Sequence, residues 1–439
     1  MFVIIIVHRL TMKNYIIDFK VLVTLISLLI TIPSNGQVYE DRIFNPEIHT
    51  VLLYRTGAEL SPPVINFNSG EQLTLSFDDL GAGYNSWQYT FIHCNADWTP
   101  TDLWQNEYLN GYTDDYIRSY TSSFNTLQPY TNYSIQIPNE NISFRIPGNY
   151  ILKVYPEGEP DNPAFTRKIL VLERRVAINA FVRPSSLIEE RFTHQEVAFS
   201  IINQNYTINE PYRQLKVVVL QNMRWDNAKY NITPLMLRDG EIDYQYTDGT
   251  ISFEGGDEFR YFDIKSLRYN SERVRAIEMR NNMYFVDLIH DRPRAFRPYI
   301  TEQDINGKFL IKSDDANDSS NEAEYAWVNF FIPFELPFPD GNMFVTGSFN
   351  EWKTDSSITL ERGRMKYNYA RQGYEARVLL KQGYYNYLYA FADNKTGSID
   401  LSQAEGNHAE TGNSYTILVY YREQGDRYDK LIAVEILEK

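Results

Sequence analysis

Short runs of apolar and aromatic residues, separated by turn-forming residues, recur along almost the whole chain and constrain its fold most. In the first part they include Trp87–Cys94 and Tyr150–Tyr155, with a Pro-Gly-Asn turn before the second. Similar runs follow at Glu196–Ile202 and Leu215–Gln221. Strands of this length and spacing are typical of antiparallel sandwiches. We therefore predict an all-β protein of tandem β-sandwich domains, of the immunoglobulin-like or early-set kind.

Composition supports this prediction and sets the number of domains. The chain contains 34 Tyr and 25 Phe, residue types that suit a pleated, half-buried surface. Its 439 residues are too many for one sandwich. We predict three domains at residues 37–173, 174–320 and 321–439, with a solvated polar linker or long loop at Ser313–Glu324. Residues 95–126 are predicted to form a long aromatic loop.

The first 36 residues have the pattern of a signal peptide. Translation could begin at Met1 or Met12, and the uncharged run Val21–Ile32 follows two lysines. Small residues just before Gln37 predict cleavage at that point. The run is shorter than the roughly 20 residues that span a bilayer, so an uncleaved anchor is the less favoured alternative. No cysteine lies near the cleavage point, and we expect a non-lipidated, soluble protein in the periplasm.

The charge excludes two classes of partner. Asp and Glu number 57 against 42 Lys and Arg, which gives a net charge of −15. A nucleic-acid-binding protein needs a basic face to displace counterions from phosphates. An anionic membrane surface would also repel this chain, so we expect no direct membrane insertion. The charge favours a protein or a neutral molecule as partner.

The sequence lacks a recognisable catalytic constellation. His93 and Cys94 are adjacent on a predicted strand, so their side chains point to opposite faces and cannot act together as base and nucleophile. Cys94 is the only cysteine and is predicted to be a small core residue. The six histidines are scattered, without zinc-ligand spacing, and no phosphate-binding loop is present. We expect a non-enzymatic protein without a metal, a cofactor or a small-molecule ligand.

The last third contains the string Met-Phe-Val-Thr-Gly-Ser-Phe-Asn-Glu-Trp at residues 343–352, followed by alternating tyrosines at 385, 387 and 389. This region is similar to glycogen- and starch-binding modules of the early-set class. The resemblance implies a β-sandwich in which Trp352 could stack on a sugar. Leu388 stands where the family has a lysine, and the second tryptophan of the family is missing. A structural role for Trp352 is the other interpretation.

Four elements of the first region form a second pattern. They are His-Cys-Asn-Ala-Asp-Trp at 93–98, Glu-Tyr-Leu-Asn-Gly-Tyr at 107–112, Ser-Phe-Asn-Thr at 123–126 and Tyr-Thr-Asn-Tyr at 130–133. Together they resemble the plug protein family of the type IX secretion system, found in relatives of Bacteroides. The family often has a histidine where this chain has Asn132. The order of the regions also matches, so the resemblance covers the whole mature chain.

This resemblance implies a non-enzymatic plug or accessory subunit. Such a protein would close the periplasmic opening of a giant outer-membrane β-barrel translocon when no cargo is engaged. We hypothesise that Trp98, Trp104, Tyr108 and Tyr112 contribute to the contact with that barrel. The other interpretation is that these aromatic residues pack the loop onto its own sandwich. Two functions remain as alternatives: a carbohydrate-binding or glycan-processing periplasmic protein using Trp352, and a periplasmic scaffold or chaperone.

Overall fold

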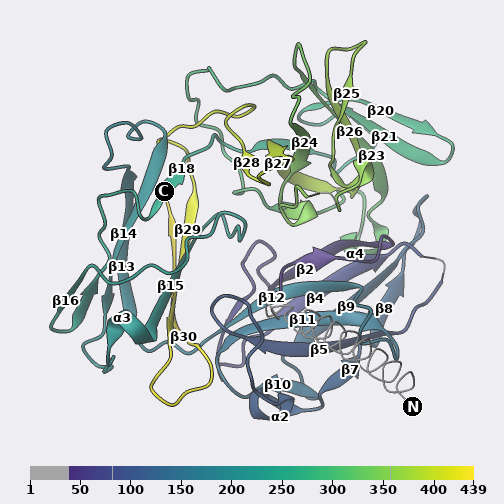
Figure 1. The fold of residues 1–439 in the computed structure, drawn as a ribbon. Coiled ribbons are helices and arrows are strands. Elements are labelled where there is room, and N and C mark those ends of the chain that lie inside the picture. Colours follow the sequence, from purple (N-terminus) through teal and green to yellow (C-terminus); the bar gives the residue numbers. More distant parts are fainter. Residues whose placement is uncertain (1–38, 82, 356) are drawn as a thin grey trace, which may run out of the picture. The chain divides into compact units, whose positions relative to one another are not determined.

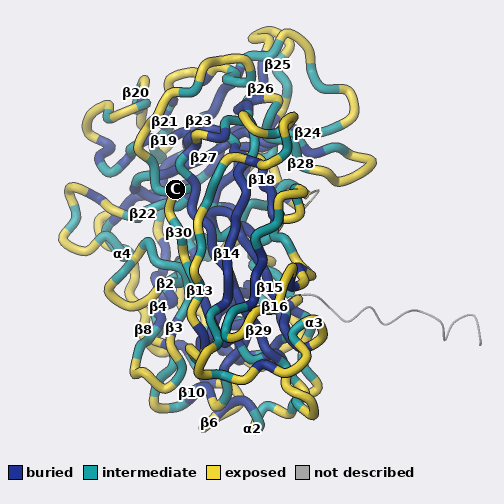
Figure 2. The backbone as a smooth tube through the Cα atoms, turned by 90° about the vertical axis from the view of Figure 1, so that its left-hand side faces the viewer, coloured by how far each residue is buried: buried dark blue, intermediate teal, exposed yellow. Residues whose placement is uncertain are grey.

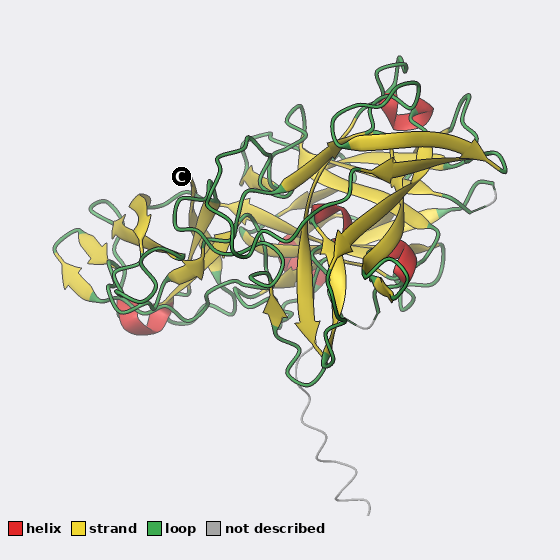
Figure 3. Cartoon of the chain, turned by 90° about the horizontal axis from the view of Figure 1, so that it is seen from above, coloured by secondary structure: helices red, strands yellow, loops and turns green. Residues whose placement is uncertain are grey.

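Strands account for most of the chain's secondary structure, in agreement with the predicted all-β class (Figure 3). The computed structural model describes residues 39–81, 83–355 and 357–439, so the predicted signal peptide lies outside the described residues. Residues 39–439 form one compact unit. Among the described residues, no helix is long and apolar enough to cross a membrane. The helices in this described part are single turns of three or four residues.

The first domain, residues 39–173, is a sandwich of two sheets (Figure 1). One sheet has the strand order β1-β12-β11-β5-β7, with β3 parallel to β12, and the other has the order β2-β4-β9-β8. The strands of the first sheet are β1 (Arg42–Ile43), β3 (Val64–Asn66), β5 (Trp87–Cys94), β7 (Asp114–Tyr116), β11 (Gly148–Pro156) and β12 (Phe165–Leu172). The strands of the second are β2 (Ile48–Arg55), β4 (Leu73–Asp79), β8 (Ser119–Ser122) and β9 (Thr131–Ile137).

The predicted loop at 95–126 contains several short regular elements. It contains the helical turn α2 (Gln105–Tyr108) and the strand β6 (Leu109–Gly111), which pairs with β10 (Ile142–Phe144). It then continues through β7 and β8, which extend the two sheets at their ends. The strands are only three or four residues long, so period-two alternation within each one is too short to be recognised in the sequence.

The second domain is split in sequence, and we call it the split domain (residues 174–254 and 414–439). Its sheets have the orders β13-β14-β17-β16, with β18 beside β14, and β15-β29-β30. Figure 2 shows β14 and β29 as buried along nearly their whole lengths. The elements are β13 (Ala177–Pro184), β14 (His194–Ile202), α3 (Pro211–Gln214), β15 (Leu215–Gln221), β16 (Met236–Arg238), β17 (Glu241–Asp243), β18 (Ser252–Glu254), β29 (Ser414–Tyr421) and β30 (Lys430–Glu438).

The third domain, residues 260–404, lies between β18 and β29 in the chain, and we call it the inserted domain. Its sheets are β20-β21-β23-β26-β25 and a sheet centred on β27, which pairs with β19, β22, β24 and β28. The strands are β19 (Arg260–Asp263), β20 (Val274–Arg280), β21 (Met283–Leu288), β22 (Phe309–Ile311), β23 (Tyr325–Pro333), β24 (Gly341–Thr346), β25 (Lys366–Asn368), β26 (Gly373–Lys381), β27 (Gly383–Asp393) and β28 (Ile399–Asp400). Three single turns complete it: α4 (Ser319–Glu322), η1 (Ser348–Asn350) and η2 (Leu360–Arg362).

This arrangement differs from the predicted division at residues 320 and 321. β19 to β22 belong to the inserted domain, whereas β29 and β30 complete the core of the split domain with β15. Of the two interpretations of Ser313–Glu324, a loop is therefore the correct one: the segment lies inside the inserted domain, contains the turn α4, and buries Glu324. A domain inserted between two strands of another cannot be recognised from strand spacing, because the pairing of β15 with β29 joins residues about 200 positions apart.

Candidate partner interface

Trp98, the first of the four predicted contact residues, is buried, with 1% of its surface exposed. Its ring packs edge-to-face on Trp225 of the split domain, with centroids 5.0 Å apart. The Lys168 ammonium lies over both indoles, at 4.6 Å from Trp98 and 4.3 Å from Trp225. Burial lowers the pKa of Lys168 to about 8, with Asp41 opposing the shift. Trp98 is thus unavailable to an external partner, and its predicted surface role is corrected to a contact between domains.

Tyr108 is also a core residue. Only 5% of its surface is exposed, and its hydroxyl donates to the carbonyl of Phe91 at 3.2 Å. Burial raises the pKa of this phenol to about 12. The predicted external contact is corrected here too, since α2 turns the ring onto the sheet behind it. For these two residues the alternative interpretation, packing within the protein, describes the structure.

Trp104 and Tyr112 differ from the other two because they lie on the surface. Trp104 is 78% exposed and occupies the N-cap of α2, where its amide donates a hydrogen bond to the Glu107 carboxylate at 2.8 Å. Tyr112 is 65% exposed, and its amide donates to the carbonyl of Asn141. Both side chains are held by ordered backbone but have their rings in solvent. They remain candidates for a contact with another protein.

The first family-like element, residues 93–98, forms a joint between the first domain and the split domain. Apolar residues on the outer faces of β11 and β12 pack against β15, β29 and β30. β12 is therefore buried along both faces. The residues of this apolar joint are Cys94, Ala96, Trp98, Ile151, Leu170, Leu172, Val218, Leu220, Leu418, Tyr420, Leu431 and Val434.

Polar groups fix the position of this apolar joint. The buried carboxylate of Asp429 accepts from the amide of Ala96 at 2.9 Å and pairs with Lys216 and Arg422 at 3.0 and 2.8 Å. His93 lies on the opposite face of β5 and packs edge-to-face on Tyr428 at 5.3 Å. Burial lowers the pKa of His93 to about 4, although the carbonyl of Pro147 and the carboxylate of Asp429 oppose the shift.

The neighbouring Cys94 agrees with its predicted role. Its thiol is fully buried among the apolar residues of the joint, and burial raises its pKa to about 12. A thiol in this state is a poor nucleophile, because the thiolate is the reactive form. His93 and Cys94 lie on opposite faces of β5, as the sequence predicts, so neither side chain can activate the other.

The elements at 123–126 and 130–133 form a second joint, between the first and the inserted domain. The Lys381 ammonium pairs with the Asp78 carboxylate at 2.7 Å, and both side chains are 1% exposed. The hydroxyl of Tyr325 and the side-chain amide of Asn132 also donate to Asp78, at 2.7 and 2.8 Å. Burial lowers the pKa of Lys381, and the Asp78 carboxylate opposes the shift.

Groups of residues 127–130, in and beside the same elements, complete this polar joint. The Glu324 carboxylate accepts from the amides of Leu127 and Gln128, the latter at 3.1 Å. The hydroxyl of Tyr130 donates to the carbonyl of Ala323 at 2.8 Å. Several residues that carry the resemblance to the plug family, such as Trp98, Tyr130 and Asn132, therefore join the domains of this chain. Others pack in the core of the first domain or reach the surface.

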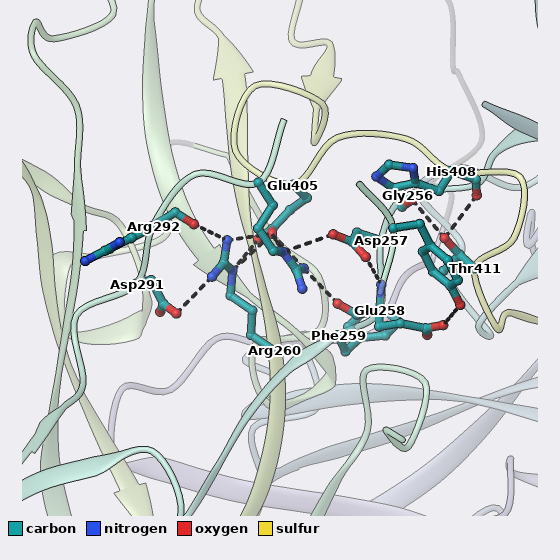
Figure 4. A network of polar contacts seen from close by, with 12 residues as sticks. Gly256, Asp257, Glu258, Phe259, Arg260, Asp291, Arg292, Glu405, His408 and Thr411 are labelled. Carbon is teal, nitrogen blue, oxygen red and sulfur yellow. Dashed lines mark hydrogen bonds and ion pairs between the residues drawn. The ribbon is translucent and has the colours of Figure 1, made fainter. Parts of the chain in front are cut away.

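A buried ionic network joins the two chain segments, residues 255–259 and 405–413, that connect the split domain to the inserted domain (Figure 4). The Arg260 guanidinium pairs with Asp291 and Glu405, each at 2.9 Å. Arg294 pairs with Glu405 at 2.8 Å and with Asp257 at 3.2 Å. Burial would raise the pKa of Glu405, but the two guanidinium groups lower it overall. Because Asp257 and Glu405 lie on different connections, these charges hold them side by side.

Trp352, the predicted sugar-stacking residue, lies at the boundary of the inserted domain. Its ring packs edge-to-face on Phe259 at 5.7 Å, and the guanidinium of Arg224 lies over it at 4.8 Å. A side chain at Gly307 would collide with the indole, with an approach of 2.3 Å. These contacts occupy the ring and support the structural interpretation of Trp352.

Two exposed tyrosines outside the predicted set form a surface aromatic pair. Tyr84 is 54% exposed and Tyr120 on β8 is 48% exposed, with ring centroids 4.5 Å apart. Both rings lie near the buried Tyr133, at 6.3 and 5.9 Å. Sequence reasoning did not single them out as a pair, because they are 36 positions apart and come together only when β8 pairs with β9.

Comparison with known proteins gives two matches. Residues 48–173 match the family described as "Type 9 secretion system plug protein 1st domain". The chain is also similar to a crystal structure of a hypothetical protein from Parabacteroides merdae, with 35% sequence identity and a TM-score of 0.87. That match covers 92% of this chain and 100% of the other. A search among curated proteins finds no match.

Proposed function

Since this chain belongs to the plug protein family of the type IX secretion system, we propose that it closes the periplasmic opening of the system's outer-membrane translocon barrel when no cargo is engaged. In this role the protein has no catalytic step. It acts in the periplasm and reaches the outer membrane through its protein partner. A wide aqueous pore needs such a cover, because it would otherwise let small solutes leak.

One observation carries the proposal: the first domain, which matches the family, is fixed to both other domains by buried contacts. The apolar joint removes Trp98 from solvent, and the polar joint buries the pair of Asp78 and Lys381. A protein that closes a pore must keep its shape while it contacts the rim of the barrel. The contact that seals the pore should bury at least about 1,000 Å². Residues 39–439 form one compact unit that can present its surface as a single body.

The surface residues Trp104 and Tyr112 supply part of the proposed contact. Their exposed rings suit the centre of an interface, where aromatic side chains contribute strongly to affinity. The chain's net charge of −15 favours a partner whose rim carries basic residues.

The test uses the purified translocon reconstituted in a planar bilayer. Adding the full mature protein should reduce the ionic conductance of the open barrel. The double variant Trp104→Ala/Tyr112→Ala should block less at the same concentration, whereas Phe296→Ala, which removes a fully exposed ring of the inserted domain, should block like the wild type. A wild-type protein that neither binds the barrel nor changes its conductance would contradict the proposed function.

A further inference from the structure

The strand β8 ends a sheet of the first domain with an open edge. It pairs with β9 on one side, and the strand order β2-β4-β9-β8 places no strand on its other side. All four residues of β8 are exposed. Figure 1 shows β8 at the end of this sheet, beside β9.

The register of β8 identifies the backbone groups that face outward. The amide of Ser123 donates to the carbonyl of Tyr130, so this pair and every second pair before it are joined by hydrogen bonds to β9. The amides and carbonyls of Tyr120 and Ser122 therefore point away from the sheet. Within the described part of the chain, no backbone or side-chain hydrogen bond satisfies them.

This edge lacks the usual protection against strand addition. Natural edge strands often carry charges, prolines or bulges that prevent pairing with another chain. The neighbouring edge strand β7 follows this rule, since it contains Asp114 and Asp115. β8 has the sequence Ser-Tyr-Thr-Ser, without charge or proline, and the nearby Arg118 is paired with Asp115 at 2.7 Å.

The side chains around β8 favour a peptide ligand in which apolar and polar residues alternate. Tyr120 points to the face of the sheet that carries Tyr133, and Tyr84 covers it there. Ser119 and Thr121 point to the other face, beside the polar Ser134 and Asn132. A strand added to β8 would place every second side chain against the tyrosines and the others in a polar environment.

We infer that β8 is a docking edge that accepts an extended segment of the translocon partner by β-strand addition. The segment alternates apolar or aromatic residues, which pack on Tyr84 and Tyr120, with polar residues on the opposite face. Its backbone pairs with the outward groups of Tyr120 and Ser122. This inference rests on the proposed function and names the chemistry by which the partner is recognised.

A partner of different sequence fits this edge better than a second copy of the chain. Two copies would each carry a net charge of −15 and would repel one another. A four-residue edge with two tyrosines also buries far less than the roughly 1,000 Å² of a stable interface, so it needs further contacts. A barrel rim with basic residues supplies those contacts without like-charge repulsion.

The test compares two substitutions at one position in the full mature protein. Ser122→Pro removes an outward amide without removing a hydrogen bond to β9, whereas Ser122→Ala keeps the amide. With the purified translocon in detergent, Ser122→Pro should weaken binding about tenfold, and Ser122→Ala should bind like the wild type. Tyr120→Ala should also bind more weakly, whereas Phe181→Ala, a comparably exposed ring on β13, should not.

Amide hydrogen exchange distinguishes pairing of a partner strand with β8 from binding in which the partner covers β8 without backbone hydrogen bonds. On binding of the wild type, the amides of Tyr120 and Ser122 should exchange more slowly, and thermal unfolding should show that every variant is folded. Equal binding by Ser122→Pro and Ser122→Ala overturns the inference while leaving the proposed function intact. If the wild type does not bind the translocon, the proposed function fails first. If sedimentation shows a wild-type dimer that Ser122→Pro abolishes, β8 pairs with a second copy and the assigned partner is wrong.

Discussion

The two joints both attach the first domain to another domain, but they do so with different chemistry. The joint to the split domain is built mainly from apolar side chains around Trp98, with the buried Lys168 and Asp429 as accompanying charged groups. The joint to the inserted domain is centred on a buried ion pair between Asp78 and Lys381 and on carboxylate contacts of Glu324. Both exclude water, but only the first gains free energy from burial alone.

This difference in chemistry gives the two joints different roles: one mainly stabilises the contact, and the other mainly fixes the relative orientation of the domains. Apolar packing stabilises a joint in proportion to buried area and tolerates small shifts of the two surfaces. A buried ion pair adds little net free energy over an apolar contact, yet it strongly penalises any arrangement that leaves one charge unpaired. We infer that the apolar joint holds the first domain in place and that the polar joint fixes its orientation.

The largest effect is expected from truncating the apolar joint. Trp98→Ala should lower the free energy of unfolding by about 4 kcal/mol, because it opens a cavity beside Trp225 and exposes Lys168 to a new environment. Urea unfolding of the full chain measures this loss. Trp104→Ala removes the same side chain from an exposed position and should change stability by less than about 0.5 kcal/mol. Equal losses in the two variants would contradict the assignment of Trp98 to a joint.

A smaller but still large effect is expected from the polar joint. Lys381→Met leaves the buried Asp78 carboxylate without its ammonium partner and should cost about 3 kcal/mol. Adding Asp78→Asn to this variant should recover part of the loss, since the remaining group is neutral. Lys395→Met breaks an exposed pair with Asp340 and serves as the control, with a change below about 0.5 kcal/mol. Failure of the double variant to recover stability would mean that the loss came from packing rather than charge.

The comparison also shows what the sequence could predict. Strands such as Trp87–Cys94 and Leu215–Gln221 agree with their predicted bounds, because buried β-type runs bounded by turn residues are a local signal. The early-set pattern around Trp352 likewise predicted a sandwich that the structure contains. The pairing of β15 with β29 was missed, since no local pattern reports contact between segments so far apart.

The site was harder to predict than the fold for a physical reason. The four predicted contact residues are all large and aromatic: Trp98, Trp104, Tyr108 and Tyr112. The path of the backbone through α2 and its neighbours decides which of their side chains are exposed. Two of the four are buried, and two are exposed. The motif carried by residues 93–98 looked like a surface feature because its partners, Trp225 and Asp429, are distant in sequence.

Acid should weaken the protein through His93 at the apolar joint. Its folded-state pKa is about 4 against about 6.5 when unfolded, so the folded protein binds fewer protons. This stability is fully present above about pH 6.5 and is lost as the pH falls towards 4. The loss between pH 7 and pH 5 should be about 2 kcal/mol for this residue. Burial also lowers the pKa of His49, which packs on Tyr325 of the polar joint, to about 4, and Arg362 adds to this shift. Its contribution has the same sign and a similar size.

Urea unfolding of the wild type and His93→Gln at several pH values measures this contribution. The variant should lose less stability between pH 7 and pH 5. A wild-type dependence that persists in His93→Gln would show that the apolar joint has no part in the acid response.

The smallest effect is expected from the exposed ion pair at the margin of the apolar joint. Glu107 and Arg427 approach to 2.9 Å, but their side chains are 37% and 47% exposed. Solvent and salt screen such a pair, so Arg427→Gln should change the free energy of unfolding by less than about 0.5 kcal/mol. Measurements in low and high salt should differ little. A loss comparable to that of Trp98→Ala would mean that charge, rather than apolar packing, holds the first domain to the split domain, and the contrast between the two joints would disappear.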